Sequence, residues 1–121
     1  MSNLVEQQKE VCRKFNSAYE PLDLDLFVGI SKNFLSGALP LNGLRHPQEG
    51  HSCGWFLWAG EEMSLIPDFF EAWHAHHLVD RRPDIAKYLG LAPGWRFLVA
   101  GNYEDVWFDE KLLECNFDEF I

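Results

Sequence analysis

The amino-acid sequence predicts an α+β fold, in which an N-terminal helix and two short helices pack on a mostly antiparallel sheet of about four to five strands. Two similar segments, GWFLWAG at residues 54–60 and GWRFLVAG at residues 94–101, are rich in the aromatic and branched residues typical of strands. The turn signal Gly101-Asn102 joins the second segment to another apolar run, which predicts a β-hairpin. With 121 residues, the chain is expected to form one domain over residues 1–121.

The first residues of the chain carry a helical pattern. Apolar side chains recur at helical spacing over residues 3–19, and Ser2 or Asn3 followed by Glu6 resembles a capping box. Pro21 is expected to end this helix, because proline cannot continue one.

The next part of the chain alternates between apolar runs and breakers. The run FVGIS at residues 27–31 predicts the first strand. The stretch SGALPLNGLRHPQEGHSC at residues 36–53 holds two prolines and three glycines, so it is predicted as a long irregular connection with a short extended piece around residues 39–41. Its leucines favour an ordered loop, and long ordered loops are often functional. After the strand around Trp55, residues 61–64 are expected to turn the chain.

Two short helices are predicted between the tryptophan-rich strands. Apolar side chains in residues 70–80 share a helical face. Residues 83–89 begin at Pro83 and are followed by Gly90, which is the order typical of a helix start and a helix end.

The hairpin of residues 95–108 is predicted at the centre of the sheet, with the strand around Trp55 as its antiparallel neighbour. A parallel βαβ crossover is the less favoured topology, because only the segment between the tryptophan-rich strands is long enough for one. Residues 110–113 predict a last helical turn, and the tail of residues 114–121 either docks on the core or forms an exposed patch.

The chain is acidic, with 19 acidic residues, 10 basic residues and a formal net charge of −9. This balance argues against nucleic acid as a partner, since phosphate binding needs clustered lysines and arginines. Residues 101–121 hold seven of the acids and one base, Lys111, so a basic partner would be attracted to that end. The alternative is a solvated face that keeps the protein soluble.

The sequence also indicates a compartment. No apolar run approaches the roughly 18 residues of a membrane span, and the N-terminus lacks the pattern of a signal peptide. A cytoplasmic protein without a membrane partner is therefore expected. Cys12, Cys53 and Cys115 are an odd number at wide spacing, so they are predicted to be reduced and mostly buried.

Motifs for catalysis and for cofactors are absent. The sequence holds no P-loop, GxGxxG or GxSxG, and nothing beside Cys53 supplies the base or oxyanion hole that a nucleophilic thiol needs. On a helix, His74 and His77 with Glu71 would form a metal face, but no HExxH or paired-cysteine spacing accompanies them. No metal or cofactor is therefore expected, and the histidines are predicted to cap loops or to pack beside Trp73.

Two surfaces could carry a function. Tyr103, Glu104, Asp105 and Trp107 combine acids with aromatic rings, as a binding hot spot for a basic partner does. The loop residues Asn42, Arg45 and His46 are predicted to extend this partner-binding surface. In the alternative, the protein is a small enzyme or ligand-binding domain, in which these three residues and His76 line a polar pocket under the loop of residues 36–53 and bind a carboxylate or phosphate.

Four motifs carry a resemblance to a known family. PLNGLRHP, CGWFLWAGEE, YLGLAPGWRFL and YEDVWFD, which lie between Pro40 and Asp109, resemble the bacterial immunity protein 33 family of polymorphic toxin systems. The resemblance implies a protein that binds and neutralises a cognate toxin and that has no catalysis of its own. The N-terminal helix and the phenylalanine-rich tail lie outside these motifs.

Overall fold

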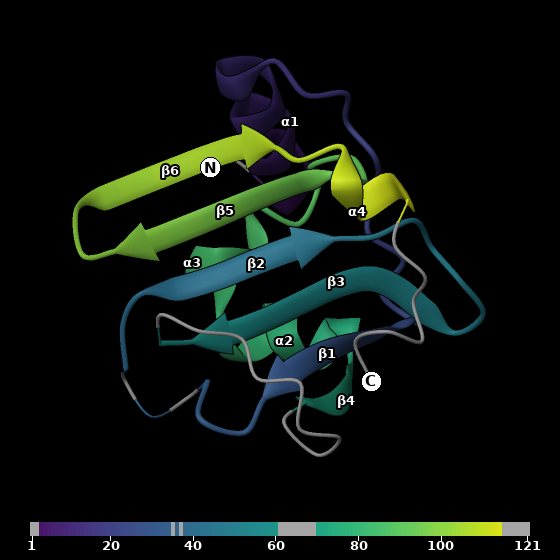
Figure 1. The fold of residues 1–121 in the computed structure, drawn as a ribbon, viewed down its shortest axis with the longest axis vertical. Helices are drawn as coiled ribbons and strands as arrows, with labels where there is room; N and C mark the ends of the chain where they lie inside the picture. Colours follow the sequence, from purple (N-terminus) through teal and green to yellow (C-terminus); the bar gives the residue numbers. More distant parts are fainter. Residues whose placement is uncertain (1–2, 35, 37, 61–69, 115–121) are drawn as a thin grey trace.

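A computed structural model describes residues 3–34, 36, 38–60 and 70–114 (Figure 1). The fold is α+β, as predicted, with six strands instead of four or five. The elements in chain order are α1 (Leu4–Phe15), β1 (Phe27–Ser31), β2 (Leu41–Arg45), β3 (Ser52–Ala59), β4 (Phe70–His74), α2 (Ala75–Arg81), α3 (Pro83–Ala86), β5 (Trp95–Ala100), β6 (Tyr103–Phe108) and α4 (Lys111–Glu114). None of these helices has both the length and the apolar character needed to span a bilayer.

The six strands form one sheet in the order β4-β1-β3-β2-β5-β6. Every neighbouring pair is antiparallel except β1 and β3, which run parallel. The connection between these two parallel strands contains β2 rather than a helix, so it is not the βαβ crossover considered from the sequence. The mostly antiparallel sheet was correctly predicted.

The hairpin of β5 and β6 was predicted at the centre of the sheet, and this placement is wrong. β6 is an edge strand, and β3 and β2 occupy the middle. Burial follows this order, since every residue of β2 is buried whereas β6 alternates between exposed and covered positions. The signals that predicted the hairpin, a Gly-Asn turn between two apolar runs, do not distinguish an edge strand from a central one.

The two tryptophan-rich strands, β3 and β5, do not pair with each other, contrary to the sequence-based expectation. β2 lies between them and pairs with both in antiparallel register, so that Leu44 stands opposite Phe56 on one side and Arg96 on the other. The similar sequences of β3 and β5 therefore reflect two neighbours of the same central strand.

The predicted loop of residues 36–53 is the largest correction to the fold, because it contains β2 and the start of β3. Its glycine at position 43 belongs to the strand interior. A Cβ atom there would overlap the ring of Phe97 and would lie 2.6 Å from Cδ2 of Leu57. This glycine thus permits close packing of β2 against its neighbours, although the same residue in a sequence indicates a turn.

Helix α1 begins as predicted and ends earlier. The side chain of Asn3 accepts a hydrogen bond from the Glu6 amide at 2.9 Å, which caps the first turn. Asn16 adopts a left-handed conformation with φ of 70° and its amide bonds back to Cys12, so the helix stops there and not at Pro21.

The predicted helix of residues 70–80 is half wrong. Its first part is the edge strand β4, which pairs with β1, and only from Ala75 does the chain become helical. Phenylalanine and tryptophan favour strands, and the open edge of β1 supplies the hydrogen bonds. Helix α3 starts at Pro83 as predicted and is shorter than expected, and α4 lies close to the predicted final turn. The predicted turn at 61–64 and the tail at 115–121 lie outside the described residues.

The sheet separates two apolar clusters. Helices α1, α2 and α3 cover one face, where buried side chains from all three pack against Trp55, Leu57 and Phe97. In Figure 1, α2 and α3 lie behind the sheet. On the opposite face, Leu112 of α4 packs with a smaller cluster that includes Phe56 and Trp58. The described helices leave β5 and β6 uncovered on this second face (Figure 1).

The close packing at Gly43 yields a first prediction. Gly43→Val is expected to reduce the free energy of unfolding by about 1–3 kcal/mol or more, because the added atoms overlap Phe97 and Leu57 in a filled interior. Denaturant unfolding followed by circular dichroism measures the change. Gly50→Asn is the matched control, since Gly50 is exposed with open space around it and asparagine tolerates its φ of 58°. Equal stability of the two variants would contradict the packing argument.

Candidate functional site

The β5–β6 hairpin divides the predicted partner-binding residues between two faces. Ala100 pairs with Tyr103 across a two-residue turn, and Gly101 has the left-handed φ of 59° that such a turn requires. Side chains alternate along β6, so Tyr103, Asp105 and Trp107 lie on the open face of the sheet and Glu104 lies on the helix-covered face. The predicted four-residue patch is therefore a three-residue patch.

The open face of the hairpin combines rings with one available carboxylate. Tyr103 is 58% exposed, Asp105 is exposed and Trp107 is half-buried. The guanidinium of Arg96 lies 5.4 Å from the centre of the Trp107 ring and forms an ion pair with Asp109 at 3.2 Å. Asp105 forms no ion pair with any residue in the described part of the chain. Its charge is thus available to a partner.

Glu104 is instead part of a contact between the hairpin and the helices. One carboxylate oxygen pairs with Lys14 of α1 at 2.9 Å, and the other accepts a hydrogen bond from the Tyr88 hydroxyl. The hydrogen bond from Tyr88, followed by that from Lys14, lowers the pKa of Glu104. Burial, followed by the hydrogen bond to Glu104, raises the pKa of Tyr88. Glu104 therefore stays ionised while it connects β6 to α1 and to the segment after α3.

The three polar residues that were assigned to a loop lie on or directly after β2, and all are buried. Asn42 is 6% exposed, Arg45 3% and His46 1%. Their accessible surface is therefore too small for the partner contact that the sequence predicted. Each has backbone partners instead, which explains how polar groups are accommodated in the middle of the sheet.

Arg45 has the largest set of these backbone partners. Its side chain donates hydrogen bonds to carbonyl oxygens of three separate segments: Cys53 at 3.4 Å, Glu20 at 3.1 Å, and Leu89 and Leu91 at 3.4 and 2.7 Å. Burial lowers the pKa of this guanidinium, although arginine remains charged in proteins. The carbonyl dipoles compensate for the charge, so Arg45 acts as a structural cross-link.

Asn42 and His46 are held on the other face of β2. The Asn42 amide donates to the carbonyl of Gly60 at 2.7 Å, and Nδ1 of His46 lies 3.1 Å from the carbonyl oxygen of Leu112. Burial lowers the pKa of His46, which favours the neutral ring. Because Arg45 points to the opposite face and His76 lies on α2, these four residues do not converge. The alternative of a polar pocket built from them is not supported.

Cys53 matches the expectation of a buried, unreactive side chain. It is 1% exposed, and burial raises the pKa of its thiol. A raised pKa keeps the sulfur protonated, whereas a nucleophile needs the thiolate. Cys12 is buried as well, with a pKa that burial also raises.

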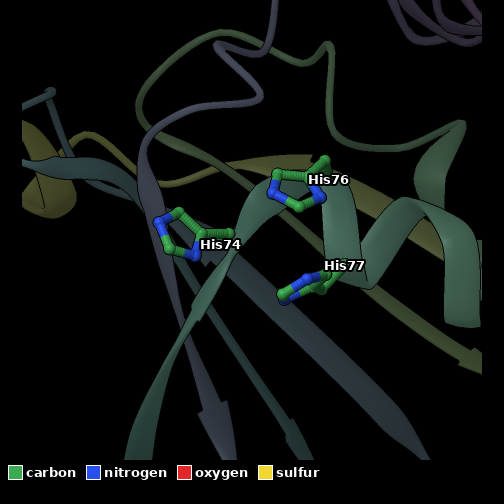
Figure 2. Close-up of side chains that lie close together, drawn as sticks. All are labelled: His74, His76 and His77. Carbon is green, nitrogen blue, oxygen red and sulfur yellow. The ribbon is translucent and has the colours of Figure 1, made fainter.

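Three histidines gather where β4 joins α2 (Figure 2). His74 is the last residue of β4, and His76 and His77 belong to the first turn of α2. One ring nitrogen of each residue lies within 4.8 Å of the others. The helical face of Glu71, His74 and His77 considered from the sequence is not formed, because Glu71 and His74 both lie on β4. His76, and not Glu71, is the third member of the cluster.

The sequence contains a signal for two of these features: the separation of Glu104 from its neighbours on β6, and the histidine cluster. The alternation along YEDVWF places Glu104 apart from its two neighbours once the segment is recognised as a strand. The spacing HAHH places three imidazoles within four residues, but their convergence depends on the change from strand to helix at Ala75. The partners of Glu104, Lys14 and Tyr88, are distant in sequence and had no signal of their own.

The contact at Glu104 yields a pH-dependent prediction. Because the pKa of Glu104 is lowered by folding, its stabilising contribution is present above the unfolded-state pKa of about 4.3 and is lost as the pH falls through the folded-state value. Wild type should therefore be more stable than Glu104→Gln near neutral pH, and the difference should shrink below about pH 4. Denaturant unfolding at several pH values measures it. A Tyr88→Phe background should weaken this pH dependence, and an unchanged dependence would contradict the assignment.

Comparison with known proteins gives one match. No curated protein and no solved structure matches the chain. The Imm33-like domain matches residues 7–109, which include most of α1 and all six strands of the sheet. Because the match covers most of the chain, the protein belongs to the Imm33-like domain family.

Proposed function

We propose that this protein is an immunity protein that binds a cognate bacterial toxin and neutralises it. The match to the Imm33-like domain over residues 7–109 is the observation that carries this proposal. Neutralisation is by binding alone. Arg45 and His46, two polar groups considered for a catalytic site, are bound to the backbone, and the Cys53 thiol is protonated and buried. The complex forms in the cytoplasm, where the immunity protein protects the cell that makes it.

The open face of the β5–β6 hairpin is the proposed contact surface. Tyr103 and Trp107 offer ring surface, which is enriched in binding hot spots, and Asp105 offers a charge that no described residue pairs with. The formal net charge of −9 favours a toxin with a basic face, because long-range attraction speeds encounter. Glu104 contributes to that long-range field from the other face and is not in the contact.

Growth protection tests the function directly. The C-terminal domain of a large secreted protein encoded beside this gene is the toxin candidate, expressed in a bacterial host from an inducible promoter. Co-expression of the immunity protein is expected to restore growth, and the two purified proteins should form a complex on gel filtration. A toxic domain that binds this protein and still stops growth would contradict neutralisation.

Adjacent carboxylates on opposite faces allow a matched test of the contact surface. Asp105→Asn and Glu104→Gln each remove one negative charge, but only Asp105 lies on the open face. We expect Asp105→Asn to slow association with the toxin several-fold at low salt and to reduce its salt dependence, since a charge at the interface acts on the association rate. Glu104→Gln should slow association less than Asp105→Asn does, because Glu104 lies on the helix-covered face and Lys14 already offsets part of its charge.

Stopped-flow or surface plasmon resonance at two or more salt concentrations provides these rates. Circular dichroism confirms that both variants are folded before they are compared. Equal effects of the two substitutions would place the contact elsewhere, and a larger effect of Glu104→Gln would assign it to the helix-covered side of the hairpin.

A further inference from the structure

We propose that His74, His76 and His77 bind a Zn²⁺ ion. The three residues place one ring nitrogen each within 4.8 Å of the others, and Figure 2 shows the rings grouped around one space. Imidazole nitrogen is a common zinc ligand, and three protein ligands with a water molecule in the fourth position form a familiar zinc site. This inference is independent of toxin binding.

The local backbone explains why the three rings converge. His74 is extended, with φ of −63° and ψ of 139°, and it stands directly before the first residue of α2. The chain therefore turns at this point and places His76 and His77 beside a ring that belongs to the strand. Ring centres are 4.2 Å apart for His76 and His77, and 5.4 and 5.8 Å apart for His74 and each of these two. On the strand side, the ring of Phe27 lies 4.5 Å from that of His74 and limits its movement.

Only small movements separate the rings from a coordination shell. Zinc–nitrogen bonds of about 2.0–2.1 Å place the nitrogens of a tetrahedral site about 3.4 Å apart. The nitrogens therefore need to approach one another by at most about 1.4 Å from their limit of 4.8 Å. Side-chain rotation can provide this, because the rings are accessible to solvent and form no hydrogen bond within the described part of the chain.

The donor set favours zinc over the abundant hard cations. Mg²⁺ and Ca²⁺ prefer oxygen ligands, whereas imidazole suits Zn²⁺ and its transition-metal neighbours. Zn²⁺ has no geometric preference from d-electrons, so it accepts the positions that one strand end and one helical turn can offer. The buried thiols of Cys12 and Cys53 do not compete for the ion, since burial raises the pKa of both.

An open hollow adjoins the histidine cluster. His74 and His77 line this hollow, together with Phe27, Trp73, Asp80 and Arg81. The hollow has room for a water molecule, which is the usual fourth ligand of such a site. Asp80 brings a carboxylate to the lining, and Arg81 brings a positive charge.

Zinc bound at this position would stabilise the edge of the sheet that is farthest from the β5–β6 hairpin. β4 is one edge of the sheet and β6 is the other. Because the ligands come from both β4 and α2, the metal would join the edge strand to the helix that follows it. Bound zinc is therefore expected to raise the melting temperature, since it binds the folded chain with ligands that the unfolded chain does not hold together.

Zinc titration of the full chain tests the proposal. Isothermal titration calorimetry with zinc chloride, under reducing conditions, is expected to show one ion per chain, and magnesium chloride to show no binding. His76→Gln should weaken zinc binding by more than about 100-fold, because loss of even an outer-shell partner costs about 10–100-fold. His51→Gln is the matched control, since it removes an exposed histidine outside the cluster. Cys115→Ser is a second control, since it removes the third cysteine and cysteine thiolates are zinc ligands.

Cobalt(II) provides a second readout, since a tetrahedral site with nitrogen ligands gives intense visible absorption that His76→Gln should abolish. Circular dichroism confirms that each variant is folded. Zinc binding and cobalt absorption that persist in His51→Gln and Cys115→Ser support the site. No zinc uptake by the wild type, equal uptake by His76→Gln, or a loss of uptake in either control would overturn it.

Discussion

The buried guanidinium of Arg45 is the interaction on which the rest of this fold depends. It lies at the end of the central strand and donates to carbonyl groups in the segment after α1, in β3 and in the connection that leads to β5. A buried positive charge is costly unless donors and acceptors are matched around it. The carbonyl oxygens are the acceptors that the guanidinium needs, and Arg45 fixes β3 and two segments distant in sequence against β2. The position of the hairpin follows, because β5 pairs with this strand.

The sequence was most informative where the signal for an element is local. The hairpin, β1, β3 and the start of α3 were recognised because apolar runs, a Gly-Asn turn and a proline at a helix start are local signals. β2 was missed for the opposite reason. Its glycine, asparagine and arginine are typical of loops, and their fitness for a buried strand depends on Phe97, Leu57 and carbonyls that are distant in sequence.

The candidate sites were also predicted well where the signal is local and poorly where it depends on contacts distant in sequence. Tyr103, Asp105 and Trp107 were identified correctly as neighbours on one strand, and their common face is a consequence of the pleat. Asn42, Arg45 and His46 were chosen because a surface loop would expose their polar groups. The structure places them on or directly after β2 and buries them, so this choice is not supported. The histidine cluster lies between these two cases. The histidines are conspicuous in the sequence, but which three of them converge depends on the change from strand to helix at Ala75.

The contact of Lys14 and Tyr88 with Glu104 has a consequence for how firmly the hairpin is held. A two-stranded ribbon at the edge of a sheet would otherwise retain much freedom, and ordering such a segment on association consumes part of the binding free energy. Here Glu104, on the helix-covered face of β6, already binds Lys14 of α1 and Tyr88 after α3. Tyr103 and Trp107, on the open face of β6, therefore lie on a preorganised strand. A partner that binds there spends little of its binding free energy on ordering the hairpin.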